Sequence, residues 1–145
     1  MNIKTLAEYY GLPEKRLREF DARDETWKGH EVVTFPYHSL KKNDDGSRTE
    51  IIRQYRGDSV SQKWWWGTAA EDYEGPGFTP FGINVHNPTA LDSILLVEGA
   101  GDVIVCHEAG VAANGIPGAT TFQAEYAPLY TTCEVASWRE HGKSG

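Results

Sequence analysis

The stretch ILLVEGAGDVIVCHEAG (Ile94–Gly110) decides the expected fold of this chain. An apolar run leads into Glu98, two glycines and Asp102 follow, and a second apolar run ends at Gly110. This order predicts a short buried strand, a sharp turn and then a helix that ends at a glycine. Glycines in the turn let the backbone bend sharply and let a ligand approach it closely.

The residues after this stretch continue the alternation of strands and helices. VAANG (111–115) predicts a second strand, QAEYAPLYT (123–131) a weak helix, and CEVASW (133–138) a third strand. Strands that alternate with helices at short intervals are typical of a parallel sheet with right-handed crossovers. The expected fold class is therefore α/β.

The first half of the chain predicts different elements. TLAEYYGLPEKRLREF (5–20) indicates two short helices, with Thr5 capping the first and Gly11 ending it. Two β-rich runs, 29–40 and 49–57, flank a polar turn that contains Asp45-Gly46, which predicts a β-hairpin. A Gly- and Pro-rich stretch, 59–91, predicts irregular structure. The expected organisation is a helical pair plus hairpin region in 1–66, a linker in 67–93 and an α/β domain in 94–145.

Composition narrows the class of protein. The chain has 145 residues, a net charge of −7 and no apolar run long enough to span a membrane. Residues 1–66 hold 12 Lys+Arg against 11 Asp+Glu, whereas residues 94–145 hold two against six. The start lacks the apolar centre of a signal peptide, and the two cysteines lack zinc-site spacing, so we expect a cytoplasmic protein without membrane or zinc.

Glu98 and Asp102 are the candidate chemical groups of the deciding stretch. Ligands of open parallel sheets bind at the carboxyl ends of the strands, where Glu98 lies, and Asp102 falls in the first turn of the expected helix. Two carboxylates there fit Mg²⁺, and Glu98 also fits a general acid or base. The alternative is that Glu98 is a solvated strand end and Asp102 a charge favoured by the helix dipole. A dinucleotide loop is disfavoured because Ile104 stands where the third glycine belongs.

LLVEGAGDVIVCHEAGVAANGIPGATTF (95–122) resembles the first half of a Toprim domain, the catalytic module of bacterial and phage primases, topoisomerases and related nucleases. Glu98, Gly99 and Asp102 match its E-G-x-x-D pattern. The preceding helical pair, hairpin and KWWWG resemble the region before Toprim in primases and primase-helicases of phages and mobile elements. The resemblance implies phosphoryl transfer with Mg²⁺, in which Glu98 is the general acid/base and Asp102 supports the metal.

The chain departs from the family pattern after the third expected strand. Toprim domains carry a second acidic motif there, and this chain offers WREHG (138–142), in which Glu140 stands in for its first acid. No second acid follows, and the zinc module that precedes many primase Toprim regions has no counterpart. The resemblance therefore leaves open a truncated piece of a larger protein or a small protein that kept the fold and lost the catalysis.

The run QKWWWG (62–67) is the candidate nucleic-acid-binding segment. Trp64, Trp65 and Trp66 stand beside Lys63, and exposed aromatic rings next to cations can stack on bases. Arg53 and Arg56 are expected to supply phosphate contacts. The alternative is that one or two of the tryptophans pack into the core, as large aromatic side chains usually do.

Three functional hypotheses follow. The first is a primase-type, Toprim-related protein that binds single-stranded DNA or nucleotide with Mg²⁺, a DNA primase-like nucleotidyltransferase if the complete active site is present. A replicative helicase, in the same chain or separate, is its expected partner. The second is a non-catalytic, degenerate Toprim module that binds single-stranded nucleic acid or a replication partner. The third is a metal-dependent nuclease of the same fold.

Overall fold

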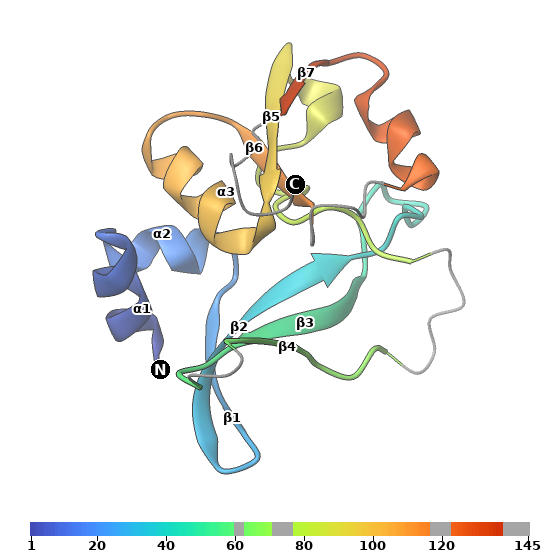
Figure 1. Cartoon of the computed structure of the whole chain (residues 1–145). Helices are drawn as coiled ribbons and strands as arrows, with labels where there is room; N and C mark the ends of the chain where they lie inside the picture. Colours follow the sequence, from blue (N-terminus) through green and yellow to red (C-terminus); the bar gives the residue numbers. More distant parts are fainter. Residues whose placement is uncertain (60–62, 71–76, 117–122, 138–145) are drawn as a thin grey trace, which may run out of the picture. The chain divides into compact units, whose positions relative to one another are not determined.

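The computed structural model describes residues 1–59, 63–70, 77–116 and 123–137. The chain divides into two compact units, Met1–Thr79 and Pro80–Gly145, which are described separately below. Figure 1 labels their helices and strands. Within the described ranges, no helix combines the length and the apolar character needed to cross a bilayer.

The first unit begins with the two predicted helices, α1 (Ile3–Tyr10) and α2 (Glu14–Glu19). The predicted cap of α1 was wrong. Asn2 is the N-cap, since its side chain accepts a hydrogen bond from the Thr5 amide while the Thr5 hydroxyl accepts one from the Asn2 amide, so Thr5 takes the third helical position of this capping box. Gly11 ends α1 in the left-handed conformation, as predicted.

An antiparallel sheet follows, in the order β1 (Arg23–Trp27), β2 (His30–His38), β3 (Glu50–Arg56) and β4 (Trp64–Trp66). The predicted hairpin is confirmed as β2 and β3. Strand β1 was not predicted; it forms a curved hairpin with β2 through Lys28 and Gly29, both at positive φ (Figure 1). The prediction of irregular structure for the tryptophan run was wrong, because three residues are too short to show a strand period.

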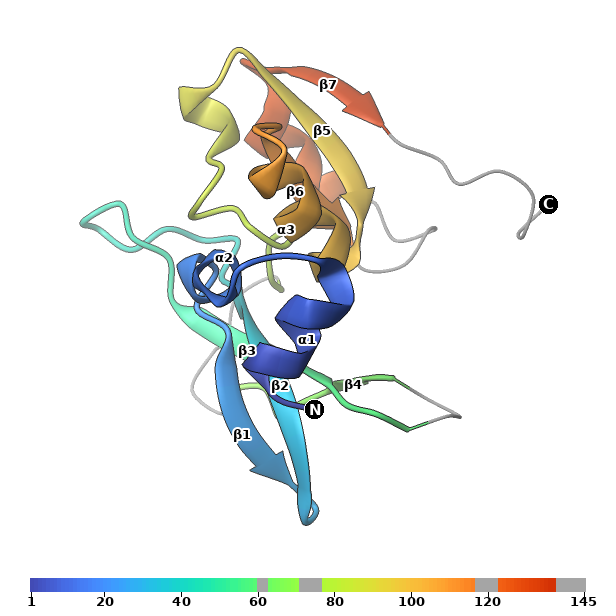
Figure 2. The ribbon, with the colours of Figure 1, turned by 90° about the vertical axis from the view of Figure 1, so that its left-hand side faces the viewer.

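The alternation of side chains sorts this sheet into two faces. The β2–β3–β4 register places four aromatic residues on one face: Phe35, Tyr37, Trp64 and Trp66. The other face carries Thr34, Arg53, Tyr55 and Trp65. Figure 2 shows the helical pair beside the sheet, where the Ile3 amide donates a 2.7 Å hydrogen bond to the Asp24 carboxylate.

The second unit contains the predicted parallel sheet, in the order β6 (Ala113–Ile116), β5 (Ser93–Glu98) and β7 (Glu134–Ser137). Helix α3 (Gly99–Glu108) joins β5 to β6, and Asp102 lies in its first turn as expected. Gly110 ends this segment at φ +78°, as predicted. Short 3-10 helices cover Pro88–Ala90 (η1) and Ala124–Tyr130 (η2), the second where a weak helix was expected.

Residues 67–93, the expected linker, are divided between the two units. In the first unit, Phe78 forms an antiparallel bridge with Ser39. In the second, Phe81 bridges Gly115, and the two residues exchange both backbone hydrogen bonds at 2.8 and 3.0 Å. One residue of this segment therefore pairs with each unit's strands or their flanking residues.

A close backbone approach fixes the turn between β5 and α3. A Cβ atom at Gly115 would lie 2.6 Å from the Gly99 carbonyl oxygen and 3.0 Å from a Val103 methyl group. Gly99 itself has φ +68°, a conformation that glycine adopts without steric cost. β6 can therefore run directly beside the turn that carries Glu98 only because position 115 lacks a side chain.

We predict that Gly115→Ala destabilises the second unit by about 2–3 kcal/mol, since backbone atoms must move to admit the methyl group. Gly110→Ala is the comparison, because it has open space around it and strains only its own φ, at a cost of about 1 kcal/mol. Urea unfolding followed by circular dichroism measures both. A neutral Gly115→Ala would contradict the tight approach.

Candidate functional site

The acidic corner consists of Glu98 and Asp102 in the second unit. Glu98 is the last residue of β5 and the N-cap residue of α3, where its exposed side chain makes no capping hydrogen bond. Asp102 is exposed in the first turn of α3. The structure thus places both residues at the carboxyl end of the central strand, Glu98 on its last position and Asp102 in the first turn of the helix that follows.

Other groups near the corner do not complete a metal site. Burial, and to a smaller extent the charge of Asp102, raise the pKa of Cys106, one turn further along α3, so this thiol stays protonated at neutral pH. In the described part of the chain, no three His, Cys, Asp or Glu side chains converge to hold a metal ion. Glu140, the predicted third acid, lies outside the described residues. A shallow hollow lined by Ser93, Val111 and Glu134 lies at the opposite end of the sheet.

The tryptophan run forms β4, whose residues alternate between the two faces of the antiparallel sheet. Trp64 is half-buried against Phe35, with ring centroids 6.0 Å apart. Trp66 is 42% exposed while it contacts Tyr37 and Phe78 at 5.0 and 5.1 Å. Trp65 is half-buried on the other face. The run is therefore neither fully packed in a core nor fully solvated.

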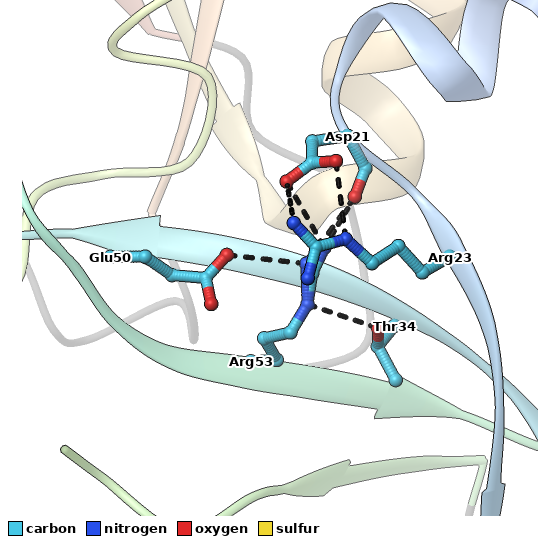
Figure 3. A network of polar contacts seen from close by, with 5 residues as sticks. All are labelled: Asp21, Arg23, Thr34, Glu50 and Arg53. Atoms are coloured by element: carbon cyan, nitrogen blue, oxygen red, sulfur yellow. Dashed lines mark hydrogen bonds and ion pairs between the residues drawn. The ribbon is translucent and has the colours of Figure 1, made fainter.

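Arg53 makes hydrogen bonds within the first unit through its guanidinium group (Figure 3). Its side chain is 9% exposed and donates from Nε to the Thr34 hydroxyl at 3.1 Å and from Nη1 to the Glu50 carboxylate at 3.3 Å. Both terminal nitrogens also donate to the Asp21 carbonyl. Burial lowers the pKa of Arg53, although an arginine remains charged at neutral pH. These contacts leave the guanidinium group poorly placed to meet a phosphate.

Arg56 is also buried, whereas Lys63 is exposed. The Arg56 guanidinium donates to the Gly57 carbonyl and lies over the rings of Tyr9 and Trp64, 5.8 and 5.6 Å from their centroids. Lys63 directly precedes β4 and is exposed. Among the cations of the predicted nucleic-acid site, Lys63 is thus the one whose position suits a phosphate contact.

A histidine pair in the second unit was not predicted. His86 Nε2 and His107 Nδ1 lie 3.0 Å apart, so one nitrogen donates a hydrogen bond to the other. The His86 carbonyl accepts from the side chain of fully buried Asn114, which in turn accepts from the Tyr130 hydroxyl. No sequence signal links residues 21 positions apart in an irregular segment and a helix. The pair fastens the segment before η1 to the last turn of α3.

Comparison of the chain with protein-family models and with curated proteins finds no match.

We predict that Arg53→Met destabilises the first unit by about 2 kcal/mol, because the buried Thr34 hydroxyl and the Asp21 carbonyl lose their donor. Arg23→Met is the matched control, since Arg23 pairs with the same Asp21 carboxylate at 2.9 Å but is half exposed. Exposed pairs contribute about 0.2–1 kcal/mol. Equal losses in the urea midpoint for the two variants would contradict the structural role of Arg53.

The second unit should lose stability as the pH falls. Burial and the charge of His107 lower the pKa of His86 below its ordinary value of 6.5. The unfolded chain then binds more protons than the folded chain, so the free energy of unfolding declines as the pH drops through and below about 6.5. His86→Gln should weaken this dependence, as measured by urea unfolding between about pH 7.5 and about pH 5.5.

His30→Gln is the control for this pH dependence, because His30 is an exposed residue of β2. Burial also lowers the pKa of His38 in the first unit, so the stability of the first unit depends on pH in both variants. An unchanged slope in His86→Gln would show that the histidine pair is not the titrating group.

Proposed function

We propose that this chain is a primase-type, Toprim-related protein that binds single-stranded DNA or nucleotide with Mg²⁺ for nucleotidyl transfer. The observation that carries the proposal is the exposed Glu98 at the carboxyl end of a central parallel strand, with Asp102 in the first turn of the helix that follows. The strand–turn–helix–strand order of β5, α3 and β6 is the context that the E-G-x-x-D pattern requires.

The donor chemistry of the corner fits Mg²⁺. This ion prefers oxygen ligands and is commonly held by one or two carboxylates, with water and substrate phosphates in its other positions. Glu98 and Asp102 supply two such carboxylates, and Glu140 is the candidate third. When bound, the ion would neutralise charge on the transferred phosphoryl group. Glu98, being exposed, is the residue we assign to proton transfer, and Gly99 leaves the turn open to a substrate.

We predict that Glu98→Gln weakens divalent-ion binding at least about tenfold, the equivalent of about 1.4 kcal/mol, because the neutral amide loses the charge attraction. Titration with Mn²⁺ should broaden the amide NMR signals of residues 99–102 in the wild type. Glu134→Gln, at the opposite end of the sheet, should leave this broadening unchanged. Metal-dependent primer synthesis, if present, should disappear with Glu98→Gln. Broadening that survives Glu98→Gln would contradict the site.

A second candidate is a non-catalytic module that binds single-stranded nucleic acid. It is favoured by β4, which keeps Trp66 42% exposed next to the exposed Lys63. Large exposed aromatic side chains beside a cation are suited to base stacking. The two candidates differ in their dependence on metal, since binding through stacking persists in EDTA whereas binding through the acidic corner does not.

A further inference from the structure

A second aromatic cluster lies on the face of the antiparallel sheet opposite Trp64 and Trp66. Trp27 of β1 contacts Trp65 of β4 with ring centroids 5.3 Å apart, and it contacts Tyr55 of β3 at 5.9 Å. All three rings are half-buried. Three aromatic residues from three different strands therefore form one continuous, partly solvated surface, which we call the aromatic platform (Trp27, Tyr55 and Trp65).

Two glycines let these rings lie down on the sheet. A Cβ atom at Gly57 would stand 2.8 Å from the Trp65 ring, and one at Gly67 would stand 2.8 Å from the Tyr55 ring. Neither glycine has a positive φ, so the backbone conformation does not require glycine at these positions. What requires it is the ring that covers each one.

Two exposed lysines lie beside residues of the platform, and the half-exposed Arg23 on the same face is paired with Asp21. The Lys28 ammonium lies over the Trp27 ring, 4.7 Å from its centroid, and Lys63 follows the same alternation as Trp65. A flexible lysine resting on Trp27 can move aside to a phosphate when a base takes its place. Glu25 lies two residues before Trp27 on the same face, so the net positive field is weak.

We propose that the aromatic platform stacks bases of single-stranded nucleic acid while Lys28 and Lys63 contact its phosphates. This inference rests on the nucleic-acid binding proposed above and identifies the surface responsible. Stacking needs no large positive field, which suits a chain with a net charge of −7. Aromatic grooves also bind proline-rich peptides, but the flanking lysines complement phosphates rather than an uncharged polyproline helix.

The test is fluorescence anisotropy with a labelled oligothymidylate of about twelve nucleotides, in EDTA and at increasing salt. Trp27→Leu and Trp65→Leu should each weaken binding by roughly 5- to 100-fold, and Trp27→Phe should keep most of it. Tyr9→Leu, which removes an exposed aromatic ring of α1 that belongs to neither face of the sheet, is the control and should retain binding. Circular dichroism verifies that each variant folds.

The salt dependence of the binding affinity tests the platform with variants of exposed lysines instead of half-buried tryptophans. Two phosphate contacts predict a slope of about −1.4 for log affinity against log salt, and Lys28→Gln or Lys63→Gln should each reduce it by about 0.7. Both lysines are exposed, so these variants are expected to fold.

The outcomes distinguish a failure of the platform proposal from a failure of the nucleic-acid binding on which it rests. If the wild type binds and Trp66→Leu abolishes binding while Trp27→Leu does not, the platform is overturned and the nucleic-acid function stands. If the wild type does not bind at low salt in EDTA, the platform and the metal-independent binding candidate are both overturned. Tighter binding of an oligoproline peptide than of the oligonucleotide would also overturn the platform.

Discussion

The first unit depends on one buried guanidinium group. Arg53 joins β3 to Thr34 of β2 and to the backbone carbonyl of Asp21, which follows α2 at a positive φ of 56°. The left-handed turn at Asp21 satisfies the end of α2, because the amides of Asp21 and Ala22 bond back to the carbonyls of residues 18 and 17. The helical pair is therefore attached to the sheet at the point where α2 ends.

In the second unit the corresponding constraint is steric. Parallel strands need a long crossover, and here the crossover is α3, which starts directly after Glu98. The missing side chain at Gly115 lets β6 pass against the Gly99 carbonyl. Because strand pairing and this contact act on the same turn, the position of Glu98 is defined by backbone geometry. Its carboxylate is thereby free of any capping role at the start of α3.

The sequence predicted the elements whose signal is local. In residues 94–110 the apolar runs and the glycines that bound them predicted a strand, a turn and a helix, and the structure confirms all three. The sequence did not predict the strands that form only because they pair with a neighbouring strand. Trp64–Trp66 becomes a strand because β3 offers a free edge, and β1 forms because Lys28 and Gly29 can turn. Trp27, Tyr55 and the His86–His107 contact were missed for the same reason, since each is a meeting of residues that are distant in sequence. The Lys28-Gly29 pair between two β-rich runs was the one signal that could have indicated β1.

The distribution of charge explains why the two proposed binding modes suit this chain. A polyanion is repelled by a net charge of −7 unless local chemistry compensates. Metal ions can bridge carboxylates to phosphates, which fits the acidic corner of the second unit. Stacking on aromatic rings attracts bases without a strong positive field, which fits the first unit, where basic and acidic residues nearly balance. Arg53 and Arg56 make hydrogen bonds inside the first unit. The proposed binding surface of this unit therefore consists mainly of aromatic rings and carries little positive charge. Its affinity for a single strand should then vary little with salt, unlike that of proteins that bind chiefly through arginine-rich surfaces.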